Sequence, residues 1–223
     1  MPLNIAIDGP VGAGKSSVAD EVARRLGILH LDTGAMYRAI GLAALRSGIP
    51  LDDEDAVTAL AGTVQVDVRQ SAEGQRTLLD GEDVSGEIRT EEVSQAASKV
   101  SSYGGVRALM VQAQQRIAAG GDMLLDGRDI GFRVLPDAQV KIYLTASAEE
   151  RARRRWLQLQ QKGSGESYEQ VLSDLMRRDL HDSTRAVDPL HPAEDAVIVD
   201  SSDLDFEETV QRVLAICEEK LHA

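Results

Sequence analysis

The sequence predicts an α/β fold, in which helices cover both faces of a mostly parallel β-sheet. Three observations support this expectation. Short apolar runs alternate with helical patterns, the first apolar run leads through a glycine-rich loop into a helix, and the 223 residues suffice for one sizeable core with an insertion. The runs that we expect to be strands are Leu3 to Asp8, Ile28 to Leu31, Met123 to Asp126, Val140 to Leu144 and Ala196 to Asp200.

The first strand leads into a run that fits the pattern G-x-x-x-x-G-K-[ST], a loop that cradles phosphate. Its glycines let backbone N–H groups turn inward around phosphate oxygens, and the following helix adds its positive dipole end. Lys15 would reach the β- and γ-phosphates, and the Ser16 hydroxyl would ligate Mg²⁺. The alternative is an ordinary glycine-rich turn. A dinucleotide-binding loop fails on spacing, because Ser17 stands where its last glycine is needed.

The second strand also leads into a helix start, at Leu31-Asp32-Thr33-Gly34-Ala35-Met36-Tyr37-Arg38. Helix N–H groups, the Thr33 hydroxyl and the Arg38 guanidinium together suit a phosphate monoester. An N-cap followed by a solvated arginine is the simpler interpretation of this segment taken alone.

The segment from about residue 62 to residue 89 breaks the alternation of strands and helices. Val64, Val66 and Val68 alternate with polar residues, and a second extended run, Arg76 to Leu79, follows a polar turn containing Glu73-Gly74. This pattern predicts a small inserted sheet of antiparallel strands. A surface hairpin without function is the alternative.

The strand that begins at Met123 ends in Asp126-Gly127-Arg128-Asp129. Asp126 therefore stands at the carboxyl end of an apolar strand, which is the edge where ligands bind in open α/β sheets. It could support a metal ion through water, and Arg128 could steer phosphate. A strand-ending Asp-Gly turn is the alternative.

The last part of the chain carries an arginine-rich helical region that we expect to form a lid. Between Ser147 and Val187 there are eight Lys and Arg against seven Asp and Glu, although the whole chain carries −13. Glycines at Gly163-Ser164-Gly165 permit a hinge, and closure over nucleotide would exclude water. A solvated helix face is the alternative. The arginines concerned are Arg151, Arg153, Arg154, Arg155, Arg177, Arg178 and Arg185.

Three further helix starts have the spacing of an N-cap residue whose partner stands three positions later. The pairs are Ser147 with Glu150, Ser167 with Gln170, and Asp205 with Glu208.

Composition limits the partners of the protein. The balance of 24 Lys and Arg against 37 Asp and Glu opposes non-specific binding to nucleic acid or anionic lipid. Cys217 is the only cysteine and lies in a helical apolar pattern, so we expect a buried thiol and a reducing compartment. No apolar run approaches the length of a membrane span and no targeting segment is visible, which predicts a soluble, cytoplasmic protein. The four histidines lack metal-ligand spacing, and we expect them to be ordinary surface or core residues.

Taken together, these motifs resemble the bacterial cytidylate kinase family, the nucleoside monophosphate kinases for CMP and dCMP. The resemblance spans nearly the whole chain. It rests on the phosphate loop, on Leu31 to Arg38, on Gly81-Glu82-Asp83-Val84-Ser85-Gly86-Glu87-Ile88-Arg89, on Asp126 to Asp129 and on Arg185-Ala186-Val187.

The family resemblance implies a three-layer P-loop kinase fold with a five-stranded parallel sheet, helices on both faces, a small antiparallel insert and an arginine-rich lid. We expect a single domain over residues 1–223. Its parts would be core 1–61, an insert on the monophosphate side at 62–104, core 105–150, lid 151–187 and core 188–223.

The resemblance also implies the site residues. The expected ATP-binding set is Gly9, Pro10, Val11, Gly12, Ala13, Gly14, Lys15, Ser16, Ser17 and Arg154. The expected CMP-binding set is Thr33, Tyr37, Arg38, Ser98, Arg107, Arg128, Asp129, Arg178, Asp182 and Arg185. Lys15, Arg128, Arg178 and Arg185 are expected to act on the transferring group, Ser16 on Mg²⁺, and Asp126 on Mg²⁺ through water.

The residue types suit cytosine. Its N4 amino group can donate to Asp129 while Arg107 donates to N3 and O2, whereas uracil reverses the pattern at positions 3 and 4. We therefore expect Mg²⁺-dependent transfer of the ATP γ-phosphoryl group to CMP or dCMP, by a monomer that binds neither nucleic acid nor membrane.

A P-loop kinase for UMP, dTMP or shikimate is the alternative, and a nucleotide-binding switch protein is a more distant one. Asp83-Val84-Ser85-Gly86 fits the D-x-x-G pattern of such switches. However, Asn4 is the only asparagine in the chain, so the guanine-reading N-K-x-D motif is missing from the sequence.

Overall fold

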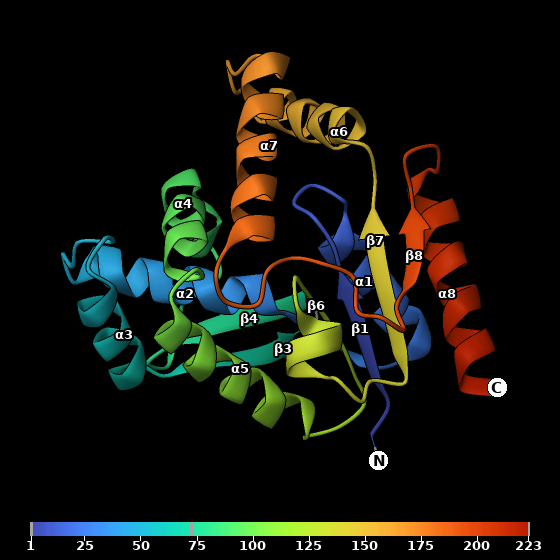
Figure 1. Cartoon of the computed structure of the whole chain (residues 1–223), viewed down its shortest axis with the longest axis horizontal. Helices are drawn as coiled ribbons and strands as arrows, with labels where there is room; N and C mark the ends of the chain where they lie inside the picture. Colours follow the sequence, from blue (N-terminus) through green and yellow to red (C-terminus); the bar gives the residue numbers. More distant parts are fainter. Residues whose placement is uncertain (1, 72–73, 223) are drawn as a thin grey trace.

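The computed structural model describes residues 2–71 and 74–222, and within them a five-stranded parallel sheet forms the centre of the molecule (Figure 1). The strands run in the order β2-β6-β1-β7-β8, so the strand that enters the phosphate loop lies in the middle. Each strand begins and ends within one residue of the predicted limits, which confirms the sheet. The bounds are β1 Asn4–Asp8, β2 Leu29–Asp32, β6 Met123–Gly127, β7 Val140–Thr145 and β8 Val197–Asp200.

Helices cover both faces of this sheet, as predicted. Because successive strand residues point to opposite faces, Ile5 and Ile7 of β1 join one apolar cluster and Ala6 between them joins the other. The first cluster is closed by α1 (Lys15–Leu26) and α8 (Phe206–His222). The second is closed by α2 (Thr33–Arg46), α3 (Glu54–Thr63), α5 (Gly104–Ala118) and the short π-helix η2 (Ile130–Val134).

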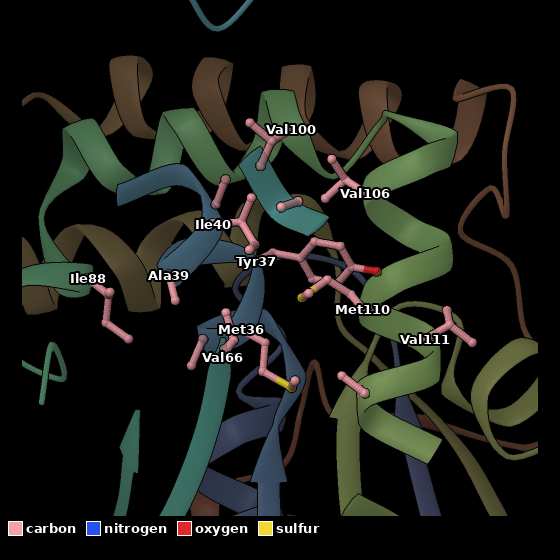
Figure 2. Packing of buried hydrophobic residues seen from close by; sticks show 14 of the residues in the cluster. Met36, Tyr37, Ala39, Ile40, Val66, Ile88, Val100, Val106, Met110 and Val111 are labelled. Atoms are coloured by element: carbon pink, nitrogen blue, oxygen red, sulfur yellow. The ribbon is translucent and has the colours of Figure 1, made fainter. Parts of the chain in front are cut away.

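The second cluster is the larger core, and Figure 2 shows Tyr37 of α2 beside Met110 of α5, with Ile40 of α2 nearer to Val100. Full burial of one such aliphatic side chain is worth about 1.5 to 3 kcal/mol. Helix α4 (Glu91–Val100) also packs on α2, and a Cβ at Gly41 would lie 2.9 Å from the Ala97 nitrogen. The tight contact fixes α4, which the sequence did not predict as a helix.

The small inserted sheet is antiparallel, in agreement with the sequence. It comprises β3 (Val66–Ser71), β4 (Gly74–Leu79) and the short β5 (Glu82–Asp83), followed by the 3-10 helix η1 (Glu87–Arg89). Val66 pairs with Leu79, and both side chains turn into the larger core. Glu73, which belongs to the predicted turn, lies outside the described residues.

Two helices, α6 (Ala148–Gln161) and α7 (Tyr168–Thr184), project beyond the carboxyl ends of the strands (Figure 1). They pack on each other through a separate apolar cluster that includes Ala152, Val171 and Leu175. The turn between them contains Gly163 at φ 78°, a left-handed conformation that favours glycine. This pair occupies the place of the predicted lid, although the division of the chain at residues 61, 104, 150 and 187 remains a prediction.

Two of the three predicted helix starts form as expected. Ser167 and Gln170 make a reciprocal capping box, and Asp205 and Glu208 exchange the same pair of bonds. The third prediction was half wrong. Ser147 accepts from the Glu150 N–H at 3.2 Å, but the Glu150 carboxylate binds Arg153 and Arg154 instead of returning to Ser147. The arginines three and four positions later compete for it.

Between residues 2 and 222, leaving aside 72 and 73, no helix is both long and apolar enough to cross a membrane.

Candidate functional site

The predicted phosphate loop connects the end of β1 to the start of α1. Gly9 has φ 150°, and a Cβ on it would lie only 2.0 Å from the backbone oxygen of Leu144 on β7. Gly12 and Gly14 have φ 77° and 85°, and Gly14 caps α1 in the left-handed conformation. The loop therefore has a backbone path that excludes a side chain at Gly9 and favours glycine at Gly12 and Gly14, and it ends on a helix N-terminus.

Lys15 is buried at the start of α1. Its Nζ atom donates to the backbone oxygen of Pro10 in the same loop at 2.8 Å. Burial, together with the nearby positive charge of Arg128, lowers the pKa of Lys15 to about 7. An anionic ligand placed in the loop would favour the charged ammonium, so this lysine is suited to a site for phosphate.

Ser16 and Asp126, predicted to serve a metal ion, are brought together from positions far apart in the chain. The Ser16 hydroxyl donates to Asp126 Oδ2 at 2.7 Å. His30 of β2 lies against the other carboxylate oxygen, with Nε2 2.9 Å from Oδ1. Burial alone would raise the pKa of Asp126, but the His30 contact, the Lys15 charge and the Ser16 hydrogen bond together outweigh it and lower the pKa. The carboxylate therefore stays ionised.

This donor set fits Mg²⁺ carried in by a nucleotide. Mg²⁺ in such sites takes one or two oxygen ligands from the protein and the rest from phosphates and water. A hydroxyl beside an ionised carboxylate, at the mouth of a phosphate loop, supplies those oxygens. The described residues contain no group of three or more His, Cys, Asp or Glu that could hold a metal alone.

The predicted monophosphate site at the start of α2 is partly engaged by the protein itself. Asp32, rather than Thr33, is the N-cap, and it accepts from the Ala35 N–H at 3.0 Å. Its other oxygen accepts from Arg38 at 2.7 Å. The Thr33 hydroxyl is buried and donates to the Asp126 backbone oxygen at 2.7 Å. A phosphate bound here would compete with Asp32 for the Arg38 guanidinium.

Arg128 lies between the two halves of the site. Its Nε atom donates to Asp182 of α7 at 2.9 Å, and its charge is among those that lower the pKa of Lys15. Burial would raise the pKa of Asp182, but the charge and hydrogen bond of Arg128 outweigh it and lower the pKa. Arg178 has its pKa lowered by burial and by the adjacent Arg128 charge. Cations crowded in this way favour a polyanionic ligand.

The predicted base-reading residues form a buried cluster. Arg107 of α5 donates to Asp129 and to the Ser101 backbone oxygen, the latter at 3.2 Å, and lies over the Tyr37 ring at 5.7 Å. Burial raises the pKa of Asp129. Arg185 has one terminal nitrogen 3.8 Å from Asp129. Ser98, half-buried on α4, lies one turn before the Ser101 contact.

Three of the predicted CMP-binding side chains carry buried polar atoms without a hydrogen-bond partner among residues 2–71 and 74–222. The atoms are the Tyr37 hydroxyl, Arg38 Nε and an Arg185 terminal nitrogen. Buried polar groups are usually paired, so such atoms gathered in one site indicate that a polar ligand completes it.

The lid arginines separate into distinct roles. Arg151 is buried and ties the lid to the phosphate loop, donating to the Val11 oxygen at 2.9 Å and to Asp179 at 2.6 Å. Arg154 reaches the Ser201 backbone oxygen at 2.6 Å, beyond the end of β8. Arg155 lies 3.8 Å from Glu91 of α4, across the site. Arg153 and Arg177 face solvent beside acidic neighbours on their own helices.

Sequence reasoning missed two buried groups. Asp8 accepts from the Ile130 and Gly131 N–H groups at 2.8 Å each, which ties the phosphate-loop strand to the segment carrying Asp129. Burial raises its pKa to about 7. His30, interpreted as an ordinary histidine, contacts Asp126. Asp8 is the last residue of β1, the same signal that identified Asp126, whereas His30 is the second of the four residues of β2.

Comparison with known proteins agrees with this geometry. The family model described as cytidylate kinase matches residues 5–219. The cytidylate kinase of Rhodococcus opacus (strain B4) is 50% identical over 98% of this chain and 96% of its own. That of Pasteurella multocida (strain Pm70) is 47% identical over 97% of this chain and 96% of its own. A solved shikimate kinase from Bacteroides thetaiotaomicron shares the fold, with a TM-score of 0.50, 13% identity and coverage of 98% and 99%. The chain belongs to the cytidylate kinase family.

Proposed function

We propose that the protein transfers the γ-phosphoryl group of ATP to CMP or dCMP, giving ADP and CDP or dCDP. The observation that carries the proposal is the segment that follows β6. Within four residues, Asp126 contacts Ser16 of the phosphate loop and Asp129 contacts Arg107 of the base-reading cluster. The end of β6 and the residues just after it thus join a triphosphate site to a cluster of paired polar groups.

On the donor side, the N–H groups of residues 9–17 surround the phosphates and Lys15 neutralises them. Arg154 lies beside the loop after β8, where it suits the nucleoside end of ATP. Ser16 would ligate Mg²⁺ and Asp126 would hold its water, and the bound ion would supply charge neutralisation of the phosphates.

On the acceptor side, Thr33, Arg38, Arg128, Arg178 and Arg185 would surround the phosphate of CMP. Permanent guanidinium charges suit this task, because their donors are fixed in a plane.

The base end uses Arg107 as donor and Asp129 as acceptor, with Ser98 and Tyr37 completing the wall. Asp182, bound to Arg128, faces the sugar. Uracil would present an oxygen where Asp129 requires a donor, and each unpaired buried group costs about 1 to 3 kcal/mol.

The reaction follows from positioning. An oxygen of the CMP phosphate attacks the γ-phosphorus in line, a new P–O bond forms, and the bond to the β-phosphate oxygen breaks with its electrons retained by ADP. The attacking oxygen is already anionic at neutral pH, so no general base is required. Lys15, Arg128, Arg178 and Arg185 spread the charge that develops on the transferring group.

The partners in this proposal are small molecules, ATP and CMP or dCMP. With a formal charge of −13, the surface repels nucleic acid and anionic membranes, and we propose a cytoplasmic monomer.

Product analysis tests the proposed function. Incubation with MgATP and CMP is expected to give ADP and CDP in equal amounts, resolved by anion-exchange chromatography. Shikimate in place of CMP should leave ATP intact, since it offers no base to Arg107 and Asp129. ADP formation without CDP would contradict the proposal.

A further inference from the structure

Asp188, in the loop that leaves α7 toward β8 (Figure 1), contacts the base-reading Arg107 and the phosphate-side Arg185 at once. Its carboxylate accepts from Arg107 Nε at 3.0 Å. Its backbone oxygen accepts from Arg185 Nε at 2.7 Å. Nothing in the local sequence distinguishes this residue, and the proposed function gives it no role.

The backbone of Asp188 adopts a conformation that most residues avoid. Its φ is 46°, and within the described residues the only other non-glycine residue with positive φ is Asp80 at 50°. In this conformation the Asp188 side chain accepts a hydrogen bond from Arg107, and its carbonyl group accepts one from Arg185. Strained backbone persists where the surrounding contacts demand it, and such positions cluster at functional sites.

The contact on Nε decides what the Arg107 guanidinium can do. A guanidinium can pair with a carboxylate through two parallel bonds, which would use two of the Arg107 nitrogens on Asp129 alone. With Nε on Asp188 and one terminal nitrogen on Ser101, only the remaining terminal nitrogen reaches Asp129. Arg107 therefore pairs with Asp129 through one nitrogen rather than two, and the contact uses only the Oδ2 oxygen of Asp129.

We propose that Asp188 is a positioning residue for base selection: it holds the Arg107 fork in the plane that lets Arg107 and Asp129 each meet cytosine. The proposal rests on the base-reading role of Arg107 and Asp129 in the proposed function. Asp188 also binds Arg185, and it lies in the loop that follows the lid. Base recognition would therefore depend on the position of that loop. Arg133, 3.6 Å from the second Asp188 oxygen and half exposed, adds a weaker contact.

The test is Asp188→Gly, since glycine adopts positive φ without cost and keeps the backbone oxygen that binds Arg185. We expect the ratio of kcat/KM for CMP to kcat/KM for UMP to fall at least tenfold, with KM for CMP raised and KM for ATP unchanged. Asp188→Asn keeps an acceptor oxygen and tolerates this backbone, so it should restore most of the ratio. Calorimetry without ATP should show that CMP affinity falls in the same order, from the parent through Asp188→Asn to Asp188→Gly.

Asp80→Gly is the matched control, because Asp80 shares the positive φ and caps the Gln65 N–H at 2.7 Å in the insert. It should lower the melting temperature and leave the base ratio unchanged. An Asp188→Gly enzyme whose ratio stays within twofold of the parent would overturn the proposal. Arg107→Lys separates the two claims. If it abolishes selectivity while Asp188→Gly does not, only the role of Asp188 fails, and if it leaves selectivity intact, the base-reading role itself fails.

Discussion

The two sides proposed for this site, one for the ATP donor and one for the CMP acceptor, are built from different materials. The donor side is mainly backbone, fixed by glycine conformations and by the Lys15 contact with the loop's own Pro10 oxygen. The acceptor side is made of arginines, and three of them are already paired with carboxylates of the protein. The pairs are Arg38 with Asp32, Arg128 with Asp182, and Arg107 with Asp129 and Asp188.

This difference implies that substrate selectivity lies on the acceptor side. A preformed backbone cradle of this kind would hold the phosphates of a donor nucleotide without reading its base. An acceptor must instead replace ion pairs with contacts of its own, and breaking a buried pair without replacement costs about 3 to 5 kcal/mol. An acceptor with a wrong base or a missing phosphate therefore leaves charged groups of the acceptor side unpaired. The donor side does not discriminate in this way.

The largest effect should come from the one charged side chain of the donor cradle. Lys15→Met removes a preorganised cation from the transferring group, and we expect kcat to fall about 10²- to 10³-fold. The melting temperature should stay close to that of the parent, because the loop path is set by glycines. Lys162→Met, at an exposed lysine on the lid, is the control and should keep full activity. Near-normal turnover in Lys15→Met would show that the backbone amides stabilise the transferring group without the lysine charge.

The next effect concerns base recognition on the acceptor side. Asp129→Asn offers an amino group to the uracil O4 oxygen and gives up an acceptor for cytosine N4, so the preference for CMP over UMP should fall about 100-fold. Competition between the two nucleotides at limiting concentration measures it. Asp55→Asn, at an exposed carboxylate on α3, should change nothing. An unaltered preference would remove Asp129 from base reading.

A pH experiment should distinguish the two sides. Lys15 has a pKa of about 7, and phosphates beside it would keep it protonated in the complex. Below pH 7 the ammonium is charged before nucleotide binds, whereas above pH 7 binding must take up a proton. MgATP affinity should therefore fall about tenfold between pH 6 and pH 8.

Calorimetry in buffers of different ionisation enthalpy would detect that proton uptake, and Lys15→Met should abolish it. The guanidinium groups of the acceptor side do not titrate in this range, so they should contribute no proton uptake to CMP binding. Equal proton uptake on MgATP binding in the parent and in Lys15→Met would show that a group other than Lys15 takes up the proton.

The smallest effect tests whether carboxylates compete with substrate. Asp32→Asn keeps an N-cap of similar strength for α2 but removes the charge that holds Arg38. Because the pair is partly exposed, its loss is worth about 0.5 to 1 kcal/mol, and KM for CMP should fall about two- to fivefold. KM for ATP should not change. A higher KM for CMP would mean that Asp32 orients Arg38 rather than competing for it.

The parts that sequence predicted well are those that local patterns specify. Contiguous apolar runs predicted the strands. One short motif predicted the phosphate loop, because its glycines permit the backbone conformations that the loop needs. The predicted sheet, insert and helical lid pair agree with the structure for the same reason.

The parts that sequence missed depend on distant positions. Arg107 and Asp188 are 81 positions apart, and Asp8 and Ile130 are 122 apart, so no spacing rule connects them. His30 resembles any core histidine until β2 and β6 are placed side by side, with His30 opposite Leu124 and Asp32 opposite Asp126. Even the local Ser147 pattern failed in part, because Arg153 and Arg154 claim the Glu150 carboxylate.

The most direct test of the central claim is the ratio of kcat/KM for CMP to kcat/KM for UMP with saturating MgATP. If acceptor choice lies in paired side chains that only cytosine can satisfy, CMP should be favoured by about 100-fold or more. Equal use of CMP and UMP would contradict the account, because it would mean that Arg107 and Asp129 do not read the base.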